Sequence, residues 1–201
     1  MKSLSILFVS TVLGAQSITV TPSATVVYPG ESLTATISLA GNAQPAAIQW
    51  TAPFSDLTHP VGTAATAASK EIRCATVNGA TSCVVFGYNA IDRIGDGVLS
   101  TVQLPTTTPG TLQIGLANVL AASQSGEMIA LTSAAVSVIV TSRCDINKSG
   151  AVDAADITAY LPQVLGAAPC TQPLLGNGKC NVGSLMVVIN AAQPGGSCAA
   201  R

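Results

Sequence analysis

Charged residues are scarce in this chain, and the few that it has do not gather into a basic patch. Of its 201 residues, 8 are Lys or Arg and 9 are Asp or Glu, which gives a net charge of −1. Nucleic-acid binding depends on clustered positive charge that neutralises phosphates. The composition therefore argues against a nucleic acid as the partner.

Residues suited to catalysis or sugar binding are equally few. The chain has one His, His59, and one Trp, Trp50. A Ser-His-Asp triad would need His59, but no nucleophile-elbow sequence lies near it, and we expect it to be a solvated turn residue. Asp92 and Asp96 flank a turn and are expected to cap it, not to form a glycosidase pair. Trp50 lies mid-strand, which favours the core over a sugar platform, so we predict no enzyme.

Long hydrophobic runs are also missing, since no segment stays apolar for the ~20 residues that a membrane-spanning helix needs. Residues 1–17 contain Lys2, a short apolar run and then small residues near Ala15 and Ser17. This order is typical of a secretory signal peptide, although a first β-strand is the alternative. We expect a secreted protein, extracellular or on the cell surface, with no membrane span in the mature chain.

Residues 18–141 show the period of β-strands. Between residues 31 and 40, apolar and hydroxyl side chains alternate, which indicates a half-buried strand. Strong helix formers are scarce, and turn signals separate further candidates, which are residues 18–27, 46–51, 71–77, 82–88, 97–104, 111–120, 128–133 and 134–141. The fold class is mainly β, a sandwich or jelly roll, with residues 62–69 as a mobile loop.

The six cysteines suit an exported protein. Asn78-Gly79 favours a two-residue type I′ hairpin turn, and this register places Cys74 opposite Cys83, within disulfide range. A zinc site is a weak alternative, because the chain has no Cys-x-x-Cys pair.

Residues 145–156 form a twelve-residue calcium-loop pattern. Oxygen ligands fall at positions 1, 3, 5, 9 and 12, and Gly150 occupies position 6, where the EF-hand loop turns sharply. The predicted ligands of one Ca²⁺ are Asp145, Asn147, Ser149, the Ala151 carbonyl, Asp153 through water, and Asp156. A polar turn that only caps a helix is the alternative.

A second, weaker copy of this loop covers residues 173–184, at an offset of 28 residues. Gly178 aligns with Gly150, but Pro173, Leu175 and Ser184 replace the ligands at positions 1, 3 and 12. Without carboxylates, this copy is expected to bind calcium poorly or not at all.

A helix is predicted after each loop, the first with a kink or early stop at Pro162 and the second over residues 183–192. Four cysteines remain in this part of the chain. We favour Cys144–Cys198 and Cys170–Cys180, although four cysteines allow three pairings.

These patterns resemble two families. A calcium loop with Asp at position 12, no preceding helix and a second copy downstream resembles a dockerin module, over residues 142–201. Residues 18–141 resemble a cohesin domain, through the Pro-Gly-Glu-Ser-Leu that opens at Pro29, the Ile-Gln-Trp-Thr at 48–51, and the strand starts at Asp96 and Gly110.

The resemblances imply a non-catalytic scaffolding protein that binds cohesin- or dockerin-bearing extracellular proteins, with calcium ordering the tail. In dockerins, loop positions 10 and 11 help to recognise the cohesin; here they are Ala154 and Ala155, then Val182 and Gly183. A carbohydrate-binding accessory module of a polysaccharide-degrading system is the alternative.

Overall fold

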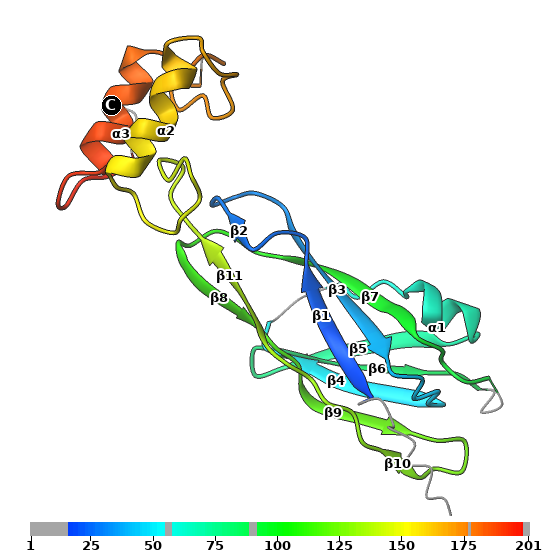
Figure 1. Cartoon of the computed structure of the whole chain (residues 1–201). Helices are drawn as coiled ribbons and strands as arrows, with labels where there is room; N and C mark the ends of the chain where they lie inside the picture. Colours follow the sequence, from blue (N-terminus) through cyan, green and yellow to red (C-terminus); the bar gives the residue numbers. More distant parts are fainter. Residues whose placement is uncertain (1–15, 55–57, 89–91, 177, 199–201) are drawn as a thin grey trace, which may run out of the picture.

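The computed structural model describes residues 16–54, 58–88, 92–176 and 178–198, and it divides visibly into a β-sandwich and a small helical end (Figure 1). Residues 1–15, the bulk of the predicted signal peptide, lie outside the described residues. None of the described helices is long and apolar enough to cross a membrane.

One layer of the sandwich is a five-stranded sheet in the order β10-β9-β4-β6-β5. Its strands are β4 (Ala47–Ala52), β5 (Glu71–Val77), β6 (Ala80–Phe86), β9 (Ala117–Ala122) and β10 (Met128–Ile129). All pairs in this sheet are antiparallel. The β5–β6 hairpin turns at Asn78 and Gly79, both with positive φ, and it pairs Cys74 with Cys83 as the sequence predicts.

The opposite layer consists of two three-stranded sheets, β1-β3-β7 and β2-β11-β8. Their strands are β1 (Ser17–Pro22), β2 (Val26–Val27), β3 (Leu33–Ala40), β7 (Gly97–Leu104), β8 (Gly110–Ile114) and β11 (Val136–Val140). β2 pairs with β11 in parallel, and β1 contacts β11, so the two sheets lie side by side. The mainly β class and the sandwich are therefore confirmed.

The core between the layers follows from the alternation seen in the sequence. β3 buries Leu33, Ala35, Ile37 and Leu39 and leaves the residues between them half-buried. Trp50 on β4 is fully buried in the same cluster, so its predicted place in the core is confirmed. Each fully buried aliphatic side chain contributes about 1.5–3 kcal/mol to folding.

The prediction of a mobile loop at residues 62–69 is wrong, because this segment contains the short helix α1 (Thr63–Ala67). α1 packs on β7 through the buried Ala64 and Ala65. The Gly62 N–H donates to the Leu99 carbonyl, and a Cβ on Gly62 would collide with the backbone of β7. Small side chains thus serve close packing here, and they do not mark mobility.

The helical end consists of α2 (Ala154–Val164) and α3 (Val182–Ala191), which pack against each other around a separate small core. Tyr160 and Val188 are fully buried there. α2 continues past Pro162 to Val164, so the stop occurs two residues later than that proline. α3 matches the predicted second helix closely.

Three disulfides are present: Cys74–Cys83, Cys144–Cys198 and Cys170–Cys180. These are the pairs that the sequence favours, and none joins the sandwich to the helical end. The Cys144–Cys198 bridge ties the start of this end to its last described residues, which stabilises a module with a small core.

Candidate functional site

The loop at residues 145–156 closes around two buried carboxylates, and the first belongs to Asp145. Asp145 is fully buried, and its Oδ1 accepts a hydrogen bond from the Ser149 N–H at 2.9 Å. Its Oδ2 accepts from the Gly150 N–H and from the Thr141 hydroxyl, both at 2.7 Å. Gly150 makes this turn with a φ of +97°, a conformation that side chains resist.

Asp156 supplies the second carboxylate and is also fully buried. Its Oδ1 accepts from the Asn147 N–H at 3.1 Å, and its Oδ2 accepts from the Asp153 N–H at 2.8 Å. Asp153 is the N-cap of α2, where its exposed side chain accepts from the Ala155 N–H at 2.7 Å. The first and last residues of the predicted loop therefore both turn inward, while Asp153 faces solvent.

The remaining predicted ligands lie between these two. The Ser149 hydroxyl donates to the Ala151 carbonyl at 3.2 Å, and Asn147 Oδ1 accepts from the Ser149 N–H at 2.9 Å. Loop positions 3, 5 and 7 are thus drawn together by local bonds.

This donor set is of the kind that a hard divalent cation takes. Neither Asp145 nor Asp156 has a salt-bridge partner among the described residues, although buried charges ordinarily pair with a cation or a metal. Carboxylate, amide, hydroxyl and carbonyl oxygens are the ligands that Ca²⁺ takes. The carboxylate oxygens of Asp145, Asp153 and Asp156 do not all lie within 4.8 Å of one another in the described structure.

The sandwich holds this loop in place from the other side. The Tyr28 hydroxyl donates to the Asp145 carbonyl at 2.9 Å, and Lys148 Nζ lies 4.6 Å from the centroid of the Tyr28 ring. Burial of Tyr28, with a smaller contribution from the negative charge of Asp145, raises the pKa of its hydroxyl to about 12. Together with Thr141, Tyr28 joins the loop to the end of the sandwich near β2 and β11 (Figure 1).

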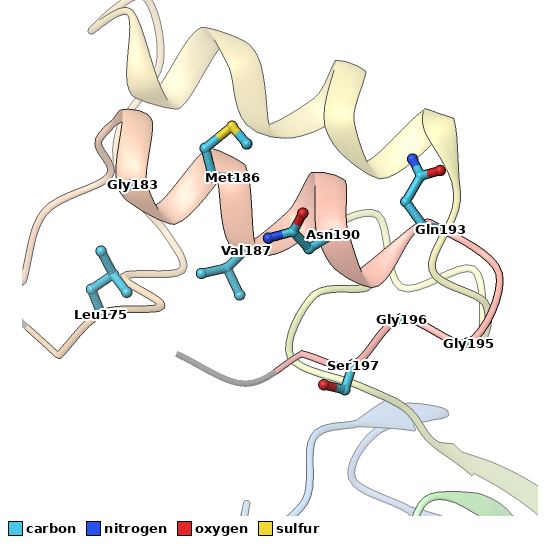
Figure 2. A pocket seen from close by; sticks show the side chains of 9 residues that line it. All are labelled: Leu175, Gly183, Met186, Val187, Asn190, Gln193, Gly195, Gly196 and Ser197. Atoms are coloured by element: carbon cyan, nitrogen blue, oxygen red, sulfur yellow. The ribbon is translucent and has the colours of Figure 1, made fainter. Parts of the chain in front are cut away.

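The second loop shares a positive-φ glycine and an N-cap with the first, at Gly178 and Asn181, and has little of its chemistry. Asn181 is the N-cap of α3 and accepts from the Ser184 N–H at 3.0 Å, as an Asp would at a loop of the first kind. Leu175, at the position of a ligand, instead lines a hollow of about 570 Å³ beside α3, together with Met186 and the chain near Gly196 (Figure 2).

The outer face of the five-stranded sheet is uncharged over its three inner strands. Strands β4, β6 and β9 contain no charged residue. Register places Gln49 and Thr51 of β4 between Ser82 and Val84 of β6 on one side and Leu120 of β9 on the other. The Arg73–Glu71 ion pair, 2.8 Å long, lies on the edge strand β5. We call this surface the β4–β6–β9 face.

The expectation that His59 is solvated is wrong. His59 is only 6% exposed and lies beside Trp50, with ring centroids 6.2 Å apart. Burial lowers the pKa of its imidazole. Asp96, in contrast, caps a turn, but the turn is the one after β3, through the N–H groups of Gly41 and Asn42.

With this geometry described, the sandwich can be compared with solved structures. A cohesin in a type I cohesin–dockerin complex from Clostridium thermocellum superposes with a TM-score of 0.53 and 14% identity, covering 63% of this chain and 99% of the other. The sandwich has the cohesin fold. A type II cohesin domain from the cellulosome of Acetivibrio cellulolyticus gives a TM-score of 0.54 at 12% identity, covering 62% of this chain and 95% of the other. A non-cellulosomal cohesin from the archaeon Archaeoglobus fulgidus gives a TM-score of 0.52 at 11% identity, covering 65% of this chain and 94% of the other.

These matches cover nearly the whole of each cohesin and leave about a third of this chain outside them. No protein-family model matches the sequence, and no curated protein matches it. The cohesin part of the resemblance thus holds at the level of the fold. No pattern in the sequence marks Tyr28 or Thr141 as a partner of the loop, although Thr141 precedes Asp145 by only four residues.

Proposed function

We propose that this chain is a non-catalytic interaction protein whose cohesin-fold sandwich binds a dockerin-type module. The observation that carries the proposal is the match over nearly the full length of cohesins, one of which was solved in a complex with a dockerin. The β4–β6–β9 face suits such contact, because its three strands have no charged side chain that would need a partner once buried.

The helical end is proposed as a dockerin-like module that binds one Ca²⁺. The ligands are Asp145, Asn147, Ser149, the Ala151 carbonyl and Asp156, with Asp153 acting through water. Bound there, the cation would neutralise two buried negative charges and fix the start of α2. Two carboxylates in the inner set favour weak affinity, on the order of 10⁻⁴–10⁻³ M.

This module would in turn dock on a cohesin of the same or another protein. The residues at loop positions 10 and 11 begin the two helices and are all exposed: Ala154 and Ala155 in α2, and Val182 and Gly183 in α3. Val182 is 67% exposed and Met186 of the same helix 48%. Partner contact at these helix starts would therefore be apolar.

The three disulfides support an oxidising, extracellular location for this function. The carbohydrate-binding alternative receives no comparable support, because Trp50, its candidate platform, is buried in the core.

Affinity capture tests the proposed partners. The full chain is immobilised, and panels of dockerin modules, cohesin modules and insoluble polysaccharides are passed over it with calcium or with a chelator. In calcium, we expect dockerin modules to be retained by the wild-type chain and by Asp145→Asn, and cohesin modules by the wild-type chain alone. The chelator should abolish cohesin retention by the wild-type chain. Retention of polysaccharide alone would overturn the proposal.

Calorimetric titration of the full chain with Ca²⁺ tests the metal site. We expect a stoichiometry of about one ion, lost in Asp145→Asn and Asp156→Asn. The matched control is Asn181→Ala, which alters the N-cap of the second loop and should leave the titration unchanged. Two equivalent sites, or unchanged binding in Asp145→Asn, would contradict the assignment of the first loop.

A further inference from the structure

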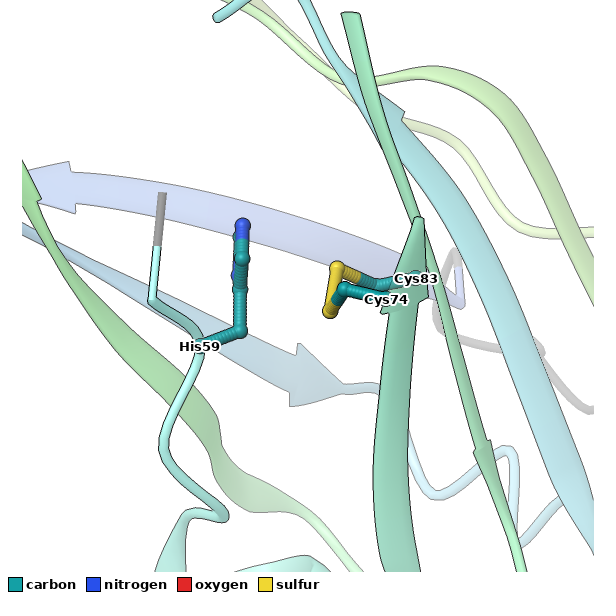
Figure 3. Close-up of side chains that lie close together, drawn as sticks. All are labelled: His59, Cys74 and Cys83. Atoms are coloured by element: carbon teal, nitrogen blue, oxygen red, sulfur yellow. A yellow bond between two sulfur atoms is a disulfide. The ribbon is translucent and has the colours of Figure 1, made fainter. Parts of the chain in front are cut away.

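A second group of metal-ligating side chains lies inside the sandwich, far in sequence from the calcium loop. Across the described ranges, His59, Cys74 and Cys83 are the one set of three His, Cys, Asp or Glu side chains whose ligand atoms all lie within 4.8 Å of one another. Figure 3 shows the imidazole of His59 beside the two sulfur atoms of the β5–β6 hairpin. A segment outside the sheet thus places a nitrogen ligand next to two sulfurs.

His59 is the unusual member of this group. The residue is only 6% exposed, yet neither of its ring nitrogens has a hydrogen-bond partner within the described structure. Leaving a buried polar group unpaired is unfavourable, and a ligand would relieve that cost. Burial also lowers the pKa of the ring, which keeps it neutral and its lone pair available.

Access and donor type are both suitable for a metal. Cys83 is fully buried, whereas Cys74 on the edge strand β5 is exposed, so the group opens to solvent on one side. Two thiolates and one imidazole, with a fourth position left to water, form a known type of Zn²⁺ site. In the structure the two sulfurs are joined in a disulfide and are therefore not thiolate ligands.

We propose that reduction of the Cys74–Cys83 disulfide creates a Zn²⁺ site formed by Cys74, Cys83 and His59. A dithiol reductant supplies two electrons and two protons, cleaves the S–S bond to two thiols and itself becomes a disulfide. Zn²⁺ then binds both sulfurs as thiolates and one nitrogen of His59, and two protons are released. The two cysteines can form the disulfide or bind the metal, but not both at once, so the hairpin can be cross-linked in two alternative ways. This inference does not depend on the proposed function.

Cobalt titration of the full chain tests the site, because Co²⁺ bound to thiolates gives a charge-transfer absorption band. The chain is reduced with a dithiol, desalted without oxygen and titrated with Co²⁺ in excess Ca²⁺, which competes for the oxygen ligands of the loop. The Cys74→Ser/Cys83→Ser double variant retains the four tail cysteines and serves as the background. Trp50, the sole Trp, lies next to His59 and reports binding through its fluorescence.

We expect the reduced chain to bind one Co²⁺ more than the double variant, with quenching of Trp50 fluorescence and displacement by Zn²⁺. His59→Phe should weaken this binding roughly tenfold or more, since loss of even a supporting residue has such an effect. The oxidised chain should show neither signal. Equal bands in the reduced chain and the double variant, or unchanged binding in His59→Phe, would overturn the proposal. Should a variant fail to fold, the absence of Trp50 quenching in the reduced wild-type chain alone would refute it.

Discussion

The buried His59 makes the stability of the sandwich depend on pH in a window where no other side chain ordinarily titrates. His59 is the only His in the chain, and burial lowers the pKa of its imidazole from the usual 6.5. The unfolded chain therefore binds a proton near pH 6.5 that the folded chain binds only at lower pH. Stability from this source is complete above pH 6.5 and is lost as the pH falls below it.

The size of the effect follows from a single proton. Each pH unit over which only the unfolded chain is protonated changes the free energy of unfolding by about 1.4 kcal/mol. Between pH 7 and pH 5.5 the loss is therefore at most about 1.3 kcal/mol, and ordinary carboxyl groups, which titrate near pH 4, add little there.

Urea unfolding followed by Trp50 fluorescence measures this loss, with calcium held constant and in excess. His59→Phe keeps an aromatic ring at the site and removes the titrating group, so its stability should be flat over the same window. A wild-type stability that does not change with pH, or an equal slope in His59→Phe, would refute the reasoning.

Three further predictions concern other parts of the chain. Tyr28→Phe removes the hydrogen bond to the Asp145 carbonyl and should destabilise the first loop by about 1–2 kcal/mol, seen as faster hydrogen exchange at residues 149–150. In an ultraviolet absorbance titration, the wild type should show a tyrosine with a pKa of about 12 that Tyr28→Phe lacks. Because the pKa of Tyr28 is higher in the folded chain, the free energy of unfolding of the wild type should fall as the pH rises from 10 to 12. Gly62→Ala should cost about 1–3 kcal/mol in thermal unfolding because its Cβ meets the backbone of β7, whereas Gly95→Ala, with open space at its Cβ, should have little effect.

Local chemistry explains which features the sequence could predict. The Asn78-Gly79 turn sets its own register, so the Cys74–Cys83 pair followed from backbone preferences alone. The alternation along β3 and the Asp153 cap of α2 likewise depend only on residues close in sequence. The predicted strand at residues 111–120 instead divides into β8 and β9, which belong to different sheets.

Features that depend on distant parts of the chain could not be predicted in the same way. Tyr28 meets Asp145 across 117 residues, and no pattern around either residue marks the contact. His59 precedes a proline, which is typical of a solvated turn, but in the folded sandwich it is buried. The sequence of α1 has no apolar period of the kind that predicts a helix. Its small side chains instead allow it to pack closely on β7.

The central claim is that the β4–β6–β9 face binds a dockerin-type module, and calorimetry with a captured dockerin tests it most directly. Thr51→Arg places an unpaired charge on β4, the central strand of this face, and Thr36→Arg places the same charge on the half-buried outer side of β3, in the opposite layer. The account predicts that Thr51→Arg weakens binding by at least about 2 kcal/mol, roughly 30-fold, while Thr36→Arg binds as the wild type does. Equal affinities in all three proteins, or a loss confined to Thr36→Arg, would contradict it.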